Sequence, residues 1–248
     1  MEKAMKNIKL AIEYDGTNYS GWQKQKNSNT IQQQLESTIS EILHENVAVT
    51  GCSRTDAGVH ARGFVANFHT ESTIPPHCFK DAINSRLVKN IVILDSQEAD
   101  KDFHARYSAI GKTYSYSILN RVAPPAIERN FVFHYKKELN YEAMNSACTY
   151  FLGEHDFSAF KSTGSSVKTS VRTIKKAYME KSKEKLIFIV EGDGFLYNMV
   201  RIMVGTLIDV GLNKIEPIEI LNIINSRDRN RAGKTAPASG LCLEAVYY

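Results

Sequence analysis

The stretch GCSRTDAGVHARG, residues 51–63, separates two runs with the composition of β-strands, residues 47–50 and 64–70. A β-hairpin turn needs only about two to five residues, and one of them is often glycine. This connection is longer, and it carries two arginines, an aspartate and a histidine. Its length and polarity indicate a role beyond reversing the chain.

The pattern around this loop predicts a split βαβ unit. Ile8, Leu10, Ile12 and Tyr14 alternate with more polar residues, as in a strand with one buried face. Thr30 and Gln33 form a capping-box pair at the start of a helix that reaches residue 45. A helix at 77–87 and a short apolar strand at 91–94 follow the loop. The predicted order is βαββαβ.

The second half repeats this order without a residue-level repeat. Strands are predicted at 112–119, 172–181, 185–191 and 241–248, and helices at 141–152, 196–210 and 217–225. The predicted fold class is therefore α+β, with two ferredoxin-like βαββαβ halves, residues 1–105 and 106–248. Each half is expected to be an antiparallel sheet with helices on one face.

The bulk composition restricts the class of protein. The chain has 248 residues, 43% of them apolar and 23% charged, which is typical of a soluble globular protein. Since no window approaches the roughly 20 apolar residues of a membrane span, we expect a cytoplasmic protein. The net charge of +4 permits a polyanionic partner. Four scattered cysteines predict reduced, mostly buried thiols.

Asp56 is the candidate reactive group of the loop, because it lies at a tip where glycine lets a ligand approach the backbone. An aspartate in such a loop commonly caps a turn through its own side chain, and spacing alone favours that structural interpretation. A metal site built from Cys52, Asp56 and His60 is a further, weaker alternative. Nucleotide-binding and zinc-hydrolase motifs are absent from the sequence, so no nucleotide or metal cofactor is expected.

Arg201 lies on an almost entirely apolar helix, FLYNMVRIMVGTLIDVG. A guanidinium on a buried face needs an anionic partner, because an unpaired buried charge costs several kcal/mol. The alternative is that its stem packs on the helix and its head reaches water. If a partner exists, it is a carboxylate from elsewhere in the chain or a ligand phosphate.

Other candidate contacts come from aromatic and basic residues. Tyr114 and Tyr116 alternate on one strand and point to one face, where they either pack in the core or stack on a base. Cations in or beside loops, interleaved with aromatic residues, suit a structured RNA. The residues predicted to bind RNA are Lys24, Lys112, Lys168 and Arg172.

Six ordered stretches resemble the bacterial tRNA pseudouridine synthase A family. They are YDGTNYSGWQ (14–23), RTDAGVHA (54–61), FHARYSAIGKTYSY (103–116), FLGEHDFSAF (151–160), NMVRIMVG (198–205) and APASGLCL (236–243). The resemblance runs in register over nearly the whole chain. One departure is Ser53, where the family usually has glycine, and serine fits a compact loop there only with negative φ.

The resemblance implies two α+β halves whose antiparallel sheets join into one large sheet with helices on one face. It also implies a homodimer that holds tRNA and converts uridine to pseudouridine at positions 38–40 of the anticodon arm, without a cofactor. In this reading Asp56 is the essential carboxylate and pairs with Arg201, Tyr114 stacks on the flipped uracil, and Arg54 fills the vacated space or holds a phosphate.

Three alternatives stay open. The chain could be a tRNA-binding module without chemistry, a paralogue that modifies a different RNA, or a small-molecule enzyme that uses Asp56 as general acid or base. A pure binder tolerates asparagine at position 56, and a small-molecule enzyme has no affinity for tRNA.

Overall fold

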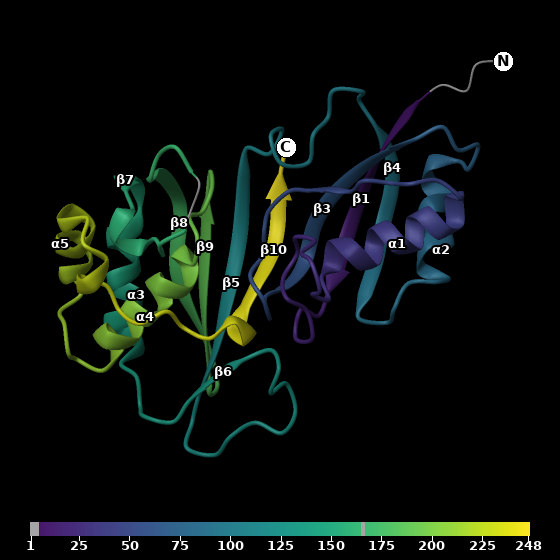
Figure 1. The fold of residues 1–248 in the computed structure, drawn as a ribbon. Helices are drawn as coiled ribbons and strands as arrows, with labels where there is room; N and C mark the ends of the chain where they lie inside the picture. Colours follow the sequence, from purple (N-terminus) through teal and green to yellow (C-terminus); the bar gives the residue numbers. More distant parts are fainter. Residues whose placement is uncertain (1–4, 165–166) are drawn as a thin grey trace. The chain divides into compact units, whose positions relative to one another are not determined.

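The computed structural model describes residues 5–164 and 167–248, which form ten strands and five α-helices (Figure 1). Contacts divide the chain into two units. Unit 1 contains Met1–Ile110 and Leu243–Tyr248, and unit 2 contains Gly111–Cys242.

Unit 1 has the predicted βαββαβ order. Its elements are β1 (Lys6–Tyr14), α1 (Ile31–Leu43), β2 (Thr50–Gly51), β3 (His60–Thr70), α2 (Phe79–Asn84) and β4 (Ile91–Ala99). β1 pairs antiparallel with both β3 and β4, and β2 pairs with β3. Ile8, Leu10 and Ile12 of β1 are fully buried, and α1 and α2 lie on one side of these strands (Figure 1). The alternation in the sequence therefore predicted the core face correctly.

The strands that flank the opening loop differ from the prediction. β3 begins at His60 rather than at residue 64, because residues 60–63 continue the strand and Ala61 pairs with Tyr14. β2 is only Thr50–Gly51, since the preceding residues bond to the helix instead. The N–H of Val47 donates to Ser40 Oγ at 3.0 Å, and that of Val49 donates to Glu36 Oε1 at 3.1 Å. The loop is therefore residues 52–59.

Unit 2 has two strands that the sequence did not predict. Its elements are β5 (Gly111–Asn120), β6 (Phe133–Tyr135), α3 (Tyr141–Cys148), β7 (Gly153–Asp156), β8 (Val171–Ser182), β9 (Lys185–Gly192), α4 (Met199–Gly211) and α5 (Glu219–Ser226), and β10 (Leu241–Tyr247) begins in it. β5, β9, β8 and β7 are antiparallel neighbours, and β6 runs parallel to β5. The unpredicted strands are β6 and β7, which are short and pair at one side only.

The strand order is β4-β1-β3-β10-β5-β9-β8-β7 in one open sheet, with β2 and β6 off this path. This confirms the α+β class and the large sheet. The boundary between the units lies after Ile110 rather than at residue 105, and unit 1 also takes in Leu243–Tyr248. The reason is that the last residues of the chain pack on residues 105–110. Tyr248 Oη donates to the Ala105 carbonyl at 2.8 Å, and the Ile110 N–H donates to the Tyr247 carbonyl at 2.9 Å.

Two further expectations concern the whole chain. In the described residues, every helix falls short of the length and apolar character that a membrane span requires. Cys52, Cys148 and Cys242 are buried, Cys78 is half-buried, and none forms a disulfide, as the sequence predicted.

Candidate active site

The loop that carries Asp56 is held by the segment that follows β1. The Trp22 N–H donates to the Thr55 carbonyl at 3.1 Å, and the Gly58 N–H donates to the Tyr19 carbonyl at 3.3 Å. Within the loop, the Val59 N–H donates to the Asp56 carbonyl at 3.2 Å. Main-chain hydrogen bonds on both sides thus fix the backbone of the half-buried Asp56.

Gly21 shows how closely these two segments approach. It adopts φ +90°, and a Cβ at this position would lie 2.5 Å from the Thr55 carbonyl oxygen. Only glycine tolerates both the left-handed backbone and this contact. YDGTNYSGWQ and RTDAGVHA, which are about 40 residues apart in the sequence, are therefore parts of one structure.

Tyr14 connects the end of β1 to the residue before Asp56. Its hydroxyl lies 2.8 Å from Thr55 Oγ1, and both side chains are buried. The ring of Tyr14 packs against Phe64 with centroids 5.6 Å apart, and Trp22 stacks on Phe64 at 4.0 Å. The sequence pattern predicted that Tyr14 is buried, but it carried no signal for the contact with Thr55.

His60 is a second buried polar group beside the loop. Its Nδ1 accepts the Gly16 N–H at 3.1 Å, which places the ring proton of the neutral imidazole on Nε2. Asp15 Oδ1 lies 3.2 Å from the same Nδ1. Since Nδ1 already accepts a hydrogen bond from the Gly16 N–H, we interpret this proximity as packing rather than as an ion pair.

The remaining residues of the loop have different environments. Arg54 is exposed, whereas Cys52 is fully buried. Ser53 is not one of the non-glycine residues with positive φ in the described part of the chain. A serine therefore fits the loop at this position, as expected. Residues 5–164 and 167–248 contain no group of three His, Cys, Asp or Glu side chains placed to hold a metal ion. The geometry therefore gives no support to a metal site of Cys52, Asp56 and His60.

Arg201 lies in the first turn of α4 and is half-buried. Its Nε donates to the Ala236 carbonyl and its Nη1 to Asn198 Oδ1, both at 2.8 Å. Asn198 is the N-cap residue of α4 and has φ +61°. Two nitrogens of the Arg201 head are thus oriented by oxygen acceptors, so the side chain does not simply extend into water.

A second segment lies along α4. The Ala236 N–H donates to the Arg201 carbonyl at 3.1 Å. A Cβ on Gly205 would lie 1.7 Å from the Lys234 carbonyl oxygen, so the two backbones touch at this point. NMVRIMVG and the chain that leads into APASGLCL therefore form one structure that orients Arg201, as the first two motifs do for Asp56.

Tyr114 and Tyr116 are alternate residues of β5 and are both buried, but their environments differ. Tyr116 is fully buried and donates to the Pro237 carbonyl at 2.7 Å. Burial raises the pKa of Tyr116 well above its usual value, and the nearby charge of Arg201 opposes this rise. The core interpretation holds for Tyr116. Tyr114 meets the edge of Phe195 at 5.1 Å, a neighbour that the sequence did not reveal.

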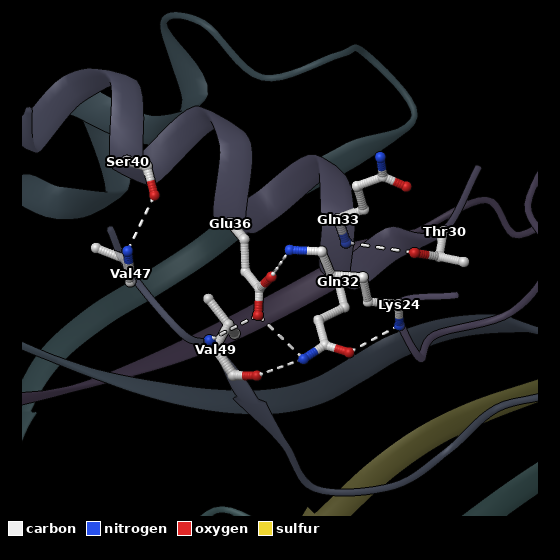
Figure 2. Close-up of polar contacts among 8 residues, drawn as sticks. All are labelled: Lys24, Thr30, Gln32, Gln33, Glu36, Ser40, Val47 and Val49. Atoms are coloured by element: carbon white, nitrogen blue, oxygen red, sulfur yellow. Dashed lines mark hydrogen bonds and ion pairs between the residues drawn. The ribbon is translucent and has the colours of Figure 1, made fainter. Parts of the chain in front are cut away.

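Lys24 belongs to a polar cluster around Glu36, defined by Lys24, Gln32, Glu36 and Val49 (Figure 2). Glu36 is 8% exposed, and its carboxylate accepts from Lys24 Nζ at 2.9 Å and from Gln32 Nε2 and the Val49 N–H at 3.1 Å. The Lys24 side chain is still 58% exposed. Lys24 therefore compensates a buried carboxylate and keeps an exposed surface.

Half of the predicted capping box forms at the start of α1. The Gln33 N–H donates to Thr30 Oγ1 at 3.4 Å. The reciprocal contact does not form, because Gln33 Oε1 is buried without a hydrogen-bond partner among the described residues. Figure 2 shows the Gln33 amide turned away from Thr30.

The other basic candidates, Lys112, Lys168 and Arg172, belong to unit 2. Lys168 is exposed and Lys112 is half-buried. Arg172 Nη1 donates to the Thr169 carbonyl at 3.1 Å, and its stem passes Gly194. In the loop after α5, Arg227 pairs with Asp156 at 3.1 Å, so this arginine has an internal partner.

The chain is similar to proteins of one known family over nearly its whole length. The model of the tRNA pseudouridine synthase family matches residues 10–108 and 147–248. A tRNA pseudouridine synthase A 2 of Clostridium perfringens is 57% identical over 98% of this chain and 100% of its own. tRNA pseudouridine synthases A of Acetivibrio thermocellus and Clostridium acetobutylicum are 56% and 54% identical over the same shares.

The matched residues include the whole Asp56 loop, the segment that holds it, α4 and the chain beside α4. Both the sequence match and the local structure thus extend over the elements that orient Asp56 and Arg201. The chain belongs to the tRNA pseudouridine synthase family.

Proposed function

We propose that this chain isomerises uridine to pseudouridine at positions 38–40 of the anticodon arm of tRNA, in the cytoplasm, through Asp56 and without a cofactor. The family assignment makes it an RNA pseudouridine synthase, an isomerase. The observation that carries the proposal for the site is the loop of Asp56, which main-chain bonds hold half-buried and which lies inside the matched residues.

The reaction needs no external reactant. The N1–C1′ glycosidic bond breaks, the uracil turns, and a C5–C1′ bond forms. The C5 proton is then lost and N1 gains a proton, so atoms and electrons balance. A stacked uridine is out of reach of a protein side chain, so the base has to be flipped into a pocket.

Asp56 acts as the ionised carboxylate. It serves either as a nucleophile on the sugar or the base, or as the base that removes a sugar proton on a route through a glycal. Both routes need a carboxylate that is positioned before the substrate arrives, and the main-chain hydrogen bonds of Thr55, Gly58 and Val59, which fix the backbone around Asp56, support this proposal.

Arg201 is the proposed partner of Asp56. Its Nε and Nη1 donate to the Ala236 carbonyl and to Asn198 Oδ1, which orients the guanidinium, and a carboxylate beside it would form a charge-assisted pair. A guanidinium also favours the ionised form of an adjacent acid. The proposed ion pair would thus hold Asp56 both charged and correctly directed.

The remaining predicted residues would bind the RNA. Tyr114 would stack on the flipped uracil, and Arg54, which is exposed beside Asp56, would fill the vacated space or hold a phosphate. Lys24, Lys112, Lys168 and Arg172 would contact phosphates. A homodimer would hold the tRNA between its subunits.

The test is formation of pseudouridine in an unmodified tRNA transcript, mapped by carbodiimide-dependent primer stops. We expect stops at positions 38–40 with the wild type and none with Asp56→Asn, while the variant still binds tRNA. Asp95→Asn is the matched control, because Asp95 is an exposed carboxylate on β4. Stops with Asp56→Asn would disprove the role of Asp56, and stops elsewhere in the RNA would identify a paralogue with another target.

A further inference from the structure

Tyr107 is the most exposed aromatic side chain among the described residues, at 77%. It lies in FHARYS, residues 103–108, between β4 and β5. The core of unit 1 does not use this ring, and the roles proposed above for Asp56, Arg201 and Tyr114 do not use it either. A large aromatic surface in water has no stabilising effect on the fold.

The ring is nevertheless held in place. The His104 ring packs on it with centroids 4.3 Å apart and planes tilted by 33°. His104 Nδ1 accepts the N–H groups of Arg106 at 3.1 Å and of Tyr107 at 3.3 Å. The turn is closed again by Ser108, whose N–H donates to the His104 carbonyl at 2.9 Å and whose Oγ accepts the His104 N–H at 3.1 Å.

These bonds make the turn a preorganised support. Because Nδ1 is an acceptor, the neutral His104 carries its proton on Nε2, and its ring orientation follows from two main-chain donors. His104 covers part of Tyr107, and the 77% exposure leaves the rest of the ring accessible. An exposed aromatic ring that is already ordered loses little conformational entropy when a ligand stacks on it.

The charge beside the ring indicates the kind of ligand. The Arg106 guanidinium carbon lies 5.7 Å from the centre of the Tyr107 ring, and Arg106 is exposed. An accessible aromatic ring next to an exposed cation matches a nucleotide, whose base stacks and whose phosphate is anionic. A protein surface would more commonly place apolar side chains around such a ring.

We infer that Tyr107 is a stacking platform for an unpaired base of the tRNA substrate, with Arg106 holding an adjacent phosphate. This rests on the proposed function for the identity of the RNA. Stacking does not read the edge of the base, so the platform contributes affinity for unpaired nucleotides rather than sequence preference.

The test uses the full-length protein and an unmodified tRNA transcript. We expect Tyr107→Leu to weaken tRNA binding by about 5-fold to 150-fold, the range for loss of one aromatic stacking contact. Tyr107→Phe keeps the aromatic ring and should bind as the wild type does. Tyr178→Leu is the matched control, because Tyr178 is a partly exposed tyrosine on β8, and it should also bind normally.

The salt dependence separates the two residues. Arg106→Gln should reduce the slope of log affinity against log salt by about 1, whereas Tyr107→Leu should lower affinity and leave the slope unchanged. A transcript with 5-iodouridine placed singly through its loops should crosslink to Tyr107 at an unpaired position. This crosslink would locate the base that stacks.

The outcomes distinguish this inference from the proposed function. If the wild type forms pseudouridine but Tyr107→Leu binds tRNA normally, the platform is disproved and the enzyme is not. If the wild type forms no pseudouridine, the proposed function fails. The tRNA affinity of Tyr107→Leu, compared with that of the wild type, still shows whether Tyr107 stacks on a base. A variant that binds tRNA normally but shifts the sedimentation coefficient would assign Tyr107 to a contact with a second copy and overturn the inference.

Discussion

The hydroxyl of Tyr14 and Oγ1 of Thr55 lie 2.8 Å apart in the interior of unit 1. This hydrogen bond joins the last residue of β1 to the residue that precedes Asp56. A bond between two buried hydroxyls restricts the loop more than an exposed one would, because water does not compete for it.

Removal of this hydrogen bond is the first prediction. Tyr14→Phe and Thr55→Val should each lower the free energy of unfolding by about 1 kcal/mol and reduce kcat more than tRNA affinity. The double variant should lose less than the sum of the two. Urea denaturation and single-turnover kinetics measure both effects. In the control Tyr141→Phe, which loses a hydroxyl bond to the Met179 carbonyl in unit 2, stability should fall while kcat stays normal.

The ion pair of Asp56 with Arg201 is the second prediction. In a cycle of Asp56→Asn, Arg201→Gln and the double variant, the free energies of unfolding should show a coupling of about 0.5 to 3 kcal/mol. The physical reason is that each single variant leaves one charge without its partner. Additive effects of the two substitutions would remove the proposed contact.

Gly205→Ala is the third prediction, and it concerns stability. The added methyl group would overlap the Lys234 carbonyl oxygen at 1.7 Å, so α4 or the neighbouring chain has to move. We expect one of the larger losses among single substitutions, about 3 kcal/mol or more in urea denaturation. Gly194→Ala is the control, since its methyl group would meet only flexible Arg172 atoms at 3.4 Å. Equal stability of the two variants would contradict the close approach.

Cysteine reactivity is the fourth prediction. Burial raises the pKa of the Cys148 thiol to about 12, and its Sγ donates to the Met144 carbonyl at 3.3 Å. At pH 8 Cys148 is therefore protonated and shielded, whereas the half-buried Cys78 is accessible. Iodoacetamide and mass spectrometry should show one label at Cys78 in the native protein and four after unfolding. Equal labelling rates for Cys148 and Cys78 would refute this.

The same shift predicts the direction of a pH effect. A thiol whose pKa is higher in the folded than in the unfolded chain supports folding below its ordinary pKa of 9.0. That contribution should decline as the pH rises from about 9 towards 12, because the unfolded chain loses its proton first. Cys148→Ala should show a smaller loss of stability than the wild type over this range.

Asp156 is the subject of the fifth prediction. The hydroxyl and N–H of Ser158, at 2.6 and 3.0 Å, and the charge of Arg227 hold its pKa below the usual value. A carboxyl group whose pKa is lower in the folded chain stabilises the fold at pH values above its ordinary pKa of 3.8. This stabilisation is lost as the pH falls through the pKa of the folded state. Ser158→Ala should thus lower Tm at pH 7, and the difference from the wild type should shrink towards pH 3. A constant difference would exclude this linkage.

The elements with regular patterns could be predicted from the sequence. The alternation in residues 7–14 located the buried face of β1, and Thr30 marked the start of α1. β7 has the sequence GEHD, whose residues have low strand propensity, and it forms because β8 offers an edge. Val47 and Val49 have the composition of a strand, but side chains of α1 accept the hydrogen bonds of their N–H groups, which are therefore not available to a neighbouring strand.

The candidate site was predictable only in part, for a physical reason. A polar loop and a cation on an apolar helix are visible as local conflicts between residue type and expected burial, and these made Asp56 and Arg201 candidates, whereas their proposed roles came from the family resemblance. The contacts that orient them join residues far apart in sequence, such as Tyr14 with Thr55 and Arg201 with Ala236. No periodicity or spacing in the sequence encodes such pairs.

The Asp56 loop is supported largely by the main chain of residues 19–22, which has a consequence for how this enzyme can diverge. Peptide groups are the same at every position, so Ser53, Arg54 and Ala57 can be exchanged without removing the bonds at Thr55 and Gly58. Natural variation can therefore alter the side chains around Asp56, the proposed reactive residue, while the main chain that carries it keeps its place.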